Sequence, residues 1–117
     1  MAIYNQLPIY KDSYQLLLEI YQVTSKFSRE HKYNLGQDMR RDALAMMRHL
    51  YGANINIEHR QEYIDRFLNM FEMLKVEIRL CVDMNIMSIN RLAHISLIMD
   101  SIAKQARAWR ARSGQKQ

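Results

Sequence analysis

The sequence is poor in residues that break regular structure and in the residue that forms covalent cross-links. It has 3 glycines, 1 proline and 1 cysteine in 117 residues. Average usage predicts about 14 glycines and prolines together. A sheet protein of this size needs many tight turns, so this scarcity favours an all-α fold. The single cysteine, Cys81, excludes an internal disulfide and any zinc site built on a cysteine pair.

Long apolar runs are missing as well. Charged residues interrupt every apolar stretch well short of the roughly 18 residues that a membrane span requires. The first ten residues lack the basic start and apolar stretch of a signal peptide. The balance of 49% hydrophobic and 25% charged residues is that of a globular chain. We therefore expect one soluble, cytoplasmic domain over residues 1–117 with no membrane partner.

Recognisable catalytic and metal-binding patterns are also lacking. No two of the four histidines share a helix face at a spacing of four residues, as a metal pair would; they are His31, His49, His59 and His94. The isolated glycines form no phosphate-binding loop, and no Glu-x-x-His pair of a di-iron bundle occurs. We expect no catalytic residue, no metal and no cofactor, and hence a protein that is not an enzyme.

Four segments carry apolar residues at steps of three and four, as amphipathic helices do. The first helix is predicted to begin near Pro8, which the opening turn of a helix tolerates. Residues 28–33 are polar and are predicted to connect it to the second helix. The predicted buried face of the first helix is Tyr14, Leu17, Leu18, Tyr21, Thr24 and Phe27.

The second helix is predicted to follow Asn34, whose side chain can accept a hydrogen bond from the backbone of Gln37 while Gln37 reciprocates. Gly52 is predicted to end this helix, because glycine readily adopts the left-handed conformation found after helix C-termini. The predicted buried face is Leu35, Met39, Ala43, Met46 and Leu50.

The third and fourth helices have the most regular spacing. Asn54 and Asn56 are candidate caps for the third helix, and Glu58 is predicted to lie in its first turn, where the helix dipole favours an anion. Its predicted core face is Ile64, Phe67, Phe71, Leu74, Ile78 and Cys81. Residues 83–85 are the predicted break and Ser88 is the predicted cap of the fourth helix. The face of that helix is Leu92, Ile95, Met99, Ile102, Ala106 and Trp109, and residues 113–117 are predicted to be a disordered basic tail.

Four such helices joined by short connections bury their apolar faces most economically as an up-down antiparallel four-helix bundle. The 9 methionines and the tyrosines near the N-terminus indicate more apolar surface than one small bundle can bury. Met47, Met73 and Met84 fall off the predicted core faces, and Ile3, Tyr4 and Tyr10 precede or begin the bundle. We therefore expect self-association.

The net charge of 17 − 12 = +5 is unevenly distributed. On the third helix, acidic residues are followed by Lys75 and Arg79, which share a face at a spacing of four. The helix dipole alone favours that order, so it indicates either a solvated helix or a two-signed binding surface. The last fourteen residues hold five bases and no acid: Lys104, Arg107, Arg110, Arg112 and Lys116. They either maintain solubility or bind phosphates, for which arginine is well suited.

The order of several short stretches resembles that of the accessory variability determinant (Avd) proteins of diversity-generating retroelements. The resemblance extends from Ile9 to Gly114 and rests on four stretches, which are residues 33–37 (Tyr-Asn-Leu-Gly-Gln), 74–80 (Leu-Lys-Val-Glu-Ile-Arg-Leu), 86–88 (Ile-Met-Ser) and 106–109 (Ala-Arg-Ala-Trp). The four-helix proteins encoded within ribosomal RNA intervening sequences share residues 36–41. They usually continue into a stretch of small residues with Asn and Glu-Gly, which residues 46–54 here do not match, so Avd is the better fit.

The resemblance implies a homopentameric barrel of four-helix protomers. It also implies association with the retroelement reverse transcriptase and its template-repeat RNA, without chemistry of its own, in mutagenic retrohoming. The basic pair of the family corresponds to Lys75 and Arg79. The candidate contacts to nucleic acid (RNA, and DNA as a second possibility) or to the polymerase are Lys75, Arg79, Lys104, Arg107, Arg110, Arg112, Arg41 and Arg48. The alternative function is a structural or ribosomal-RNA-binding role of the intervening-sequence type.

Overall fold

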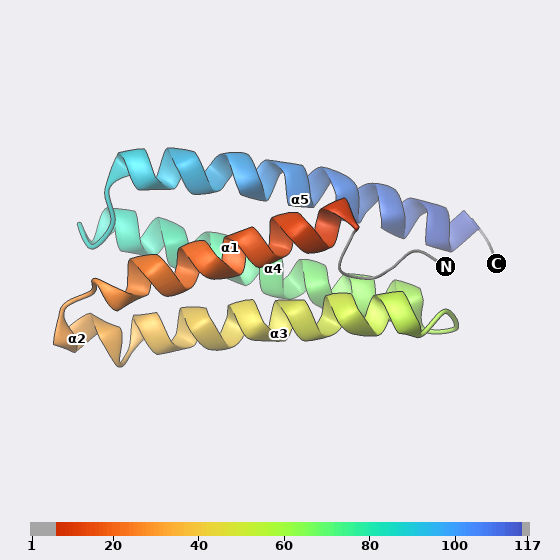
Figure 1. The fold of residues 1–117 in the computed structure, drawn as a ribbon, viewed down its shortest axis with the longest axis horizontal. Helices are drawn as coiled ribbons and strands as arrows, with labels where there is room; N and C mark the ends of the chain where they lie inside the picture. Colours follow the sequence, from red (N-terminus) through yellow and green to blue (C-terminus); the bar gives the residue numbers. More distant parts are fainter. Residues whose placement is uncertain (1–6, 116–117) are drawn as a thin grey trace.

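The computed structural model describes residues 7–115, without the side chain of Gln115, and over that range the fold is all-helical. The four long helices are α1 (Pro8–Ser25), α3 (Leu35–Ile55), α4 (Arg60–Asp83) and α5 (Ile89–Gln115). A one-turn helix, α2 (Arg29–Lys32), lies within the polar connection between α1 and α3. Successive long helices run antiparallel along a molecule that measures 47 Å in its longest dimension (Figure 1).

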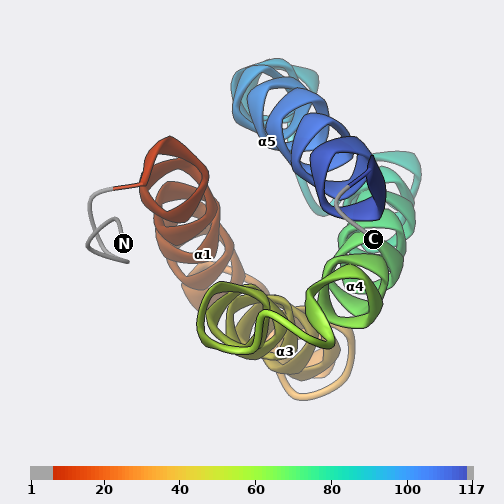
Figure 2. The same cartoon turned by 90° about the vertical axis from the view of Figure 1, so that its right-hand side faces the viewer.

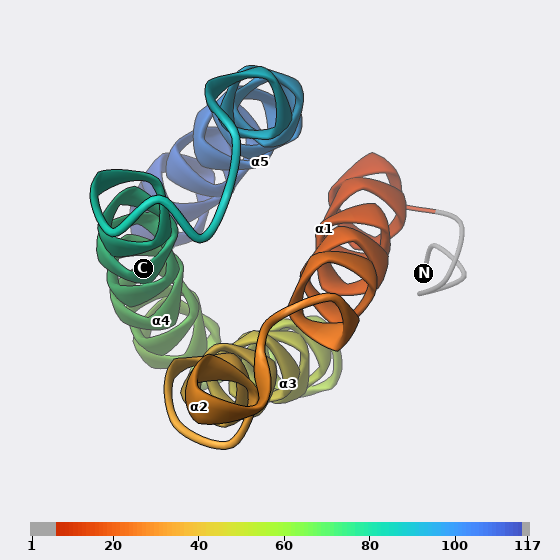
Figure 3. The same cartoon turned by 90° about the vertical axis from the view of Figure 1, so that its left-hand side faces the viewer.

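The long helices follow one another around the bundle in the order α1, α3, α4, α5, as the two end-on views show (Figures 2 and 3). Each one packs against the two that flank it, and α1 also contacts α5. The predicted four-helix bundle is therefore confirmed. Because the number of long helices is even, α1 begins and α5 ends at the same end of the molecule (Figure 1).

The core faces predicted for α4 and α5 are confirmed. All six predicted residues of α4 are buried, from Ile64 to Cys81. In α5, Ile95, Met99, Ile102 and Ala106 are buried, and Leu92 and Trp109 pack against the core from half-buried positions. Both predictions succeed because the predicted residues recur at steps of three and four, which places them along one side of each helix.

The buried face predicted for α1 is only partly correct, although Leu17 packs against the core from a half-buried position. Tyr14 and Leu18 are 46% and 37% exposed, and only Thr24 and Phe27 of the predicted face are buried. The buried face is instead Ile9, Ser13, Leu16, Glu19, Ile20, Val23 and Thr24. Branched aliphatic side chains have no polar atom to satisfy, whereas the tyrosine face keeps its hydroxyl groups near water. This face was not predicted because it contains the charged residue Glu19. In the structure the carboxylate of Glu19 is buried and paired with Arg91 at 2.9 Å.

The predicted ends of α3 differ from those observed. Asn34 precedes the helix, but its side-chain amide donates to the carbonyl of Glu30 at 2.9 Å and makes no capping hydrogen bond with Gln37. Gly52 lies inside α3, which continues to Ile55. A Cβ atom at Gly52 would lie 2.5 Å from two ring carbons of Tyr63. The glycine therefore permits close approach of α3 and α4 and does not terminate a helix.

The remaining connections are partly as predicted. Glu58 precedes α4, which begins at Arg60, so Glu58 is not in the first turn. The break after α4 is confirmed, and Asn85 there adopts a φ of 61°, a conformation that asparagine tolerates better than most residues. The Ser88 cap is also confirmed, because its hydroxyl accepts a hydrogen bond from the backbone of Arg91 at 3.1 Å. Helix α5 continues to Gln115, beyond the predicted start of the tail at residue 113, and residues 116–117 lie outside the described range.

Candidate nucleic-acid and partner interface

The basic pair of α4 lies on the surface of the bundle. The ammonium of Lys75 is 3.6 Å from a carboxylate oxygen of Glu72, and the guanidinium of Arg79 is 3.2 Å from Asp83. Both basic side chains are well exposed, at 49% and 73%. Exposed ion pairs at this helical spacing contribute only about 0.3–0.5 kcal/mol. An incoming phosphate can therefore compete for either cation at small cost.

The cations in the second half of α5 fall into two groups. Arg110 holds Asp65 of α4 through two contacts, from its Nε to Oδ1 and from its Nη2 to Oδ2, the second at 3.3 Å. Within residues 7–115, the exposed cations Lys104, Arg107 and Arg112 make no ion pair. Arg110 thus joins two helices, and the other three cations remain available to an anion.

The two candidate residues of α3 also differ. Arg41 is paired with Asp38 at 3.2 Å and with Asp42 at 3.3 Å. Arg48 is exposed and makes no ion pair with any described residue. The candidate cations therefore have unequal access to an anionic partner.

The structure does not bring all of these cations into one patch. Because Arg110 contacts Asp65, these two residues lie at about the same height along the bundle axis. Lys75 and Arg79 lie ten and fourteen residues beyond Asp65, which at 1.5 Å per residue is about 15 and 21 Å further along the bundle. Lys104, six residues before Arg110 on the antiparallel α5, lies about 9 Å in the same direction, so Lys75 is only about 6 Å beyond its level. The candidate interface thus has a basic end formed by Lys104, Arg107 and Arg112 of α5, and the pair on α4 lies further along the bundle.

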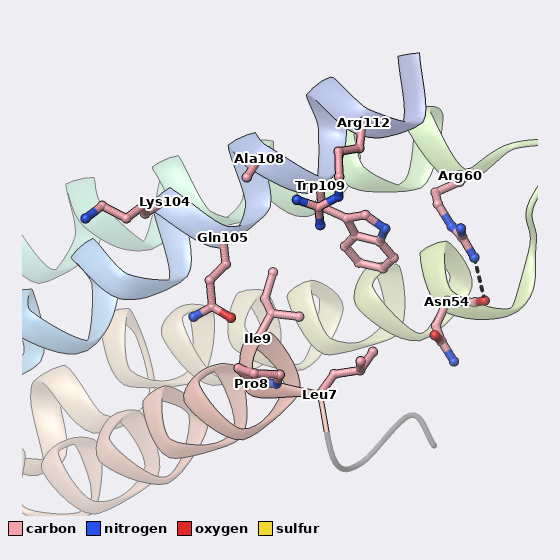
Figure 4. Close-up of a pocket in the computed structure, with 10 residues that line it drawn as sticks. All are labelled: Leu7, Pro8, Ile9, Asn54, Arg60, Lys104, Gln105, Ala108, Trp109 and Arg112. Carbon is pink, nitrogen blue, oxygen red and sulfur yellow. Dashed lines mark hydrogen bonds between the residues drawn. The ribbon is translucent and has the colours of Figure 1, made fainter. Parts of the chain in front are cut away.

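A cavity of about 540 Å³ lies at the basic end, between the start of α1, the α3–α4 corner and the last turns of α5 (Figure 4). Three of its ten lining residues are cations and none is an acid. The lining is Leu7, Pro8, Ile9, Asn54, Arg60, Lys104, Gln105, Ala108, Trp109 and Arg112. Trp109 and Gln105 project from α5 toward Leu7 and Ile9 (Figure 4).

Arg60 was not among the predicted site residues, yet it organises one wall of this cavity. Its Nε donates to the carbonyl of Ala53 at 2.7 Å and its Nη2 to that of Asn54 at 3.0 Å, so it satisfies carbonyls in the last turn of α3. Its guanidinium also lies 5.4 Å from the ring centroid of Trp109. One sequence signal was available: a cation in the first turn of α4 opposes the helix dipole, which indicates a compensating partner elsewhere.

A pair of buried carboxylates lies on the α3–α4 contact, apart from the cavity. Glu77 and Asp42 are 8% and 7% exposed, and Oε1 of Glu77 has no hydrogen-bond partner among the described residues. Burial raises the pKa of Glu77 to about 8, with further contributions from a hydrogen bond with Asp42 and from its negative charge. Within residues 7–115, no three His, Cys, Asp or Glu side chains converge as a metal site would require.

The fold defines a class: a small four-helix bundle, here with exposed cations on the last turns of α5. No helix among residues 7–115 combines the length and apolar character needed to cross a bilayer. The sequence matches the bAvd-like family over residues 7–113, which is most of the chain. The protein therefore belongs to the bAvd-like family, in agreement with the Avd resemblance of its sequence. A comparison with curated proteins gives no match.

Proposed function

We propose that this protein is a non-catalytic, cytoplasmic accessory component of a diversity-generating retroelement. In this role it binds template-repeat RNA and the retroelement reverse transcriptase, and it supports mutagenic retrohoming. Family membership over residues 7–113 supports the biological context. RNA binding is supported by the basic end, where Lys104, Arg107 and Arg112 are exposed and make no ion pair with any described residue.

Such a surface suits a polyanion for electrostatic reasons. Cations that already hold carboxylates must give up those contacts to bind phosphate, whereas unpaired cations release only counterions. Arginine also binds phosphate through two parallel hydrogen bonds. Lys75 and Arg79 of α4 form ion pairs only with exposed acids, so they can also bind phosphate. We expect binding that weakens steeply with salt and depends little on RNA sequence.

The proposal includes contacts with protein partners and assembly as a homopentamer. Large apolar side chains that are exposed on the described bundle support such contacts, among them Tyr14 and Leu18 on α1, Val76 on α4, and Ile89 and Leu97 on α5. Met73 and Met84 are each 47% exposed, whereas Met47 packs against the core. Ile3 and Tyr4 lie outside the described residues. Sedimentation analysis tests the assembly, and a monomer at micromolar concentration would contradict it.

The test of function is to capture the full-length protein with its RNA and protein partners from cells that carry the retroelement. RNA sequencing and mass spectrometry should identify template-repeat RNA and the reverse transcriptase. Recovery of ribosomal RNA without a polymerase would instead support the intervening-sequence type of role. A reverse-transcriptase gene and a template/variable repeat pair beside the gene are a further expectation.

A charge-reversal pair tests the role of α4. Lys75→Glu/Arg79→Glu should weaken RNA binding and reduce the slope of log K against log salt by about 1.4, since each single-strand phosphate contact contributes about 0.7. Lys26→Glu/Arg29→Glu is the matched control, because it changes the net charge equally at two exposed positions, one directly after α1 and one in α2. Equal losses of affinity for both variants would leave only a general charge effect and refute a specific role for Lys75 and Arg79.

A further inference from the structure

The cavity at the basic end offers more than positive charge. Its walls combine a tryptophan ring, the aliphatic side chains of Leu7 and Ile9, and the cations Arg60, Lys104 and Arg112. At about 540 Å³ it falls within the range of roughly 300–1,000 Å³ that is usual for sites of small organic ligands. A ligand that matches these walls must carry a planar apolar group and negative charge together.

The aromatic wall is fixed in place before any ligand binds. Two hydrogen bonds to α3 carbonyls hold Arg60, which in turn faces the ring of Trp109. The indole is half-buried and extends from α5 into the space beside Leu7 and Ile9 (Figure 4). A stacking surface that is already ordered loses little conformational freedom when a planar group packs against it.

Two cations of the lining precede and follow Trp109 along α5. Lys104 and Arg112 are two helical turns apart on α5, about 12 Å along its axis, and Trp109 lies between them in the sequence. A base within a nucleic-acid strand has a phosphate on each side of it. A strand that stacks one base on Trp109 can therefore present one phosphate toward Lys104 and the other toward Arg112.

We propose that this cavity binds one nucleotide unit of a single-stranded nucleic acid, with the base stacked at Trp109 and the flanking phosphates held by Lys104 and Arg112. The proposal deepens the proposed function, because it rests on nucleic-acid binding and adds where one nucleotide is held. Stacking on aromatic side chains is tolerant of base identity, so the site should hold any of the four bases. A neighbouring hollow of about 260 Å³ shares Arg60, Trp109 and Arg112 but also contains Glu58, which disfavours a phosphate there.

Trp109 provides its own reporter, because it is the only tryptophan in the chain. Tryptophan fluorescence is measured while the full-length protein is titrated with a single-stranded oligouridylate, with uridine monophosphate and with uridine. Fluorescence anisotropy of a labelled copy of the same oligonucleotide measures total RNA binding independently. The oligonucleotide should quench Trp109 fluorescence over the concentration range in which anisotropy rises. The monophosphate should quench more weakly, and uridine should be the weakest quencher of the three.

Ala108→Glu places an acid in the cavity lining, and Ala111→Glu makes the same change three residues further along α5, outside both hollows. Both alanines are exposed, so neither substitution disturbs the core. Ala108→Glu should weaken oligonucleotide binding by about ten-fold or more relative to Ala111→Glu and abolish quenching, as the loss of one stacked base predicts. Lys104→Gln and Arg112→Gln should each weaken binding more than Arg107→Gln, whose cation lies outside the lining.

The outcomes separate this inference from the proposed function. If the oligonucleotide binds by anisotropy but leaves Trp109 unquenched, and Ala108→Glu behaves as Ala111→Glu does, the cavity proposal is overturned while RNA binding stands. If the oligonucleotide fails to bind at low salt, the RNA-binding function is refuted. If only the monophosphate then quenches Trp109, and Ala108→Glu removes that quenching, the cavity is a nucleotide site for a free ligand and its assignment to a strand is overturned.

Discussion

The buried carboxylate of Glu77 makes the stability of this bundle depend on pH in a direction opposite to the usual one for carboxylates. Burial between α3 and α4 is the main cause of its raised pKa, about 8, and Asp42 and Asp38 add to it while Arg41 opposes it. The ordinary value is 4.5. At neutral pH the folded protein therefore keeps a proton on Glu77 that the unfolded chain releases.

The sign and size of the effect follow from this difference. The unfolded chain binds fewer protons between about pH 4.5 and 8, so the free energy of unfolding falls as pH rises through that window. The contribution is fully present below about pH 4.5 and lost above about pH 8. The slope approaches 1.4 kcal/mol per pH unit, which gives a total of at most about 5 kcal/mol. This loss is a large fraction of the 5–15 kcal/mol that stabilises a typical domain.

Glu77→Gln is the informative perturbation, because glutamine has nearly the same shape as the protonated acid and cannot ionise. Its amide can also donate to the carboxylate of Asp42, as the protonated acid does. We expect the variant to match the wild type near pH 5 and to exceed its stability by a few kcal/mol near pH 8.5. Glu72→Gln, on the same helix but exposed, is the control and should shift stability by less than about 1 kcal/mol at any pH.

The assay is urea unfolding followed by far-ultraviolet circular dichroism at several pH values from about 5 to 9, with all variants at one protein concentration. The slope of stability against pH should be reduced in Glu77→Gln and retained in Glu72→Gln. Parallel curves for wild type and Glu77→Gln across this range would refute the argument, because they would mean that Glu77 is ionised in the folded protein.

Three further predictions concern packing. Gly52→Ala should destabilise the protein by about 1–3 kcal/mol in urea unfolding, because the new Cβ would meet the ring of Tyr63. In a Tyr63→Ala background the same substitution should be neutral or stabilising. Destabilisation of the same size in both backgrounds would exclude the ring as the cause. Leu16→Ala should lower the free energy of unfolding by about 2–5 kcal/mol, and Leu18→Ala should lower it much less when the protein is dilute. The reverse order would indicate that the tyrosine-bearing face of α1 is the buried one. Burial raises the pKa of the Cys81 thiol to about 11. The thiol should therefore react with iodoacetamide at neutral pH only as fast as the protein unfolds. Rapid labelling of the native protein would contradict this burial.

The helices could be predicted from the sequence wherever one face was clearly apolar. The spacing from Ile64 to Cys81 identified all six buried apolar residues of α4, because they recur at steps of three and four, but it did not identify the buried Glu77. Helix α1 has two apolar faces, one with tyrosines and one interrupted by Ser13 and Glu19. Periodicity alone cannot choose between them, because the choice depends on Arg91 of α5, which pairs with Glu19 from 72 residues away.

The candidate site was predictable only in part for the same physical reason. The excess of bases in α5 is visible in the sequence, but the difference between Arg110 and Arg112 is not. Arg110 is held by Asp65, 45 residues earlier in the chain. The cavity brings together the start of α1, the corner between α3 and α4, and the last turns of α5, and only the antiparallel arrangement makes these segments neighbours.

That arrangement also affects how the protein should be handled. Since α1 begins and α5 ends at the same end of the bundle as the cavity, an affinity tag or fused domain at either terminus is tethered within reach of Lys104 and Arg112. Tethering gives such a group a high effective concentration there, so an acidic tag would compete with RNA and a basic tag would add affinity of its own. Binding constants for this protein should therefore be compared before and after the tag has been cleaved.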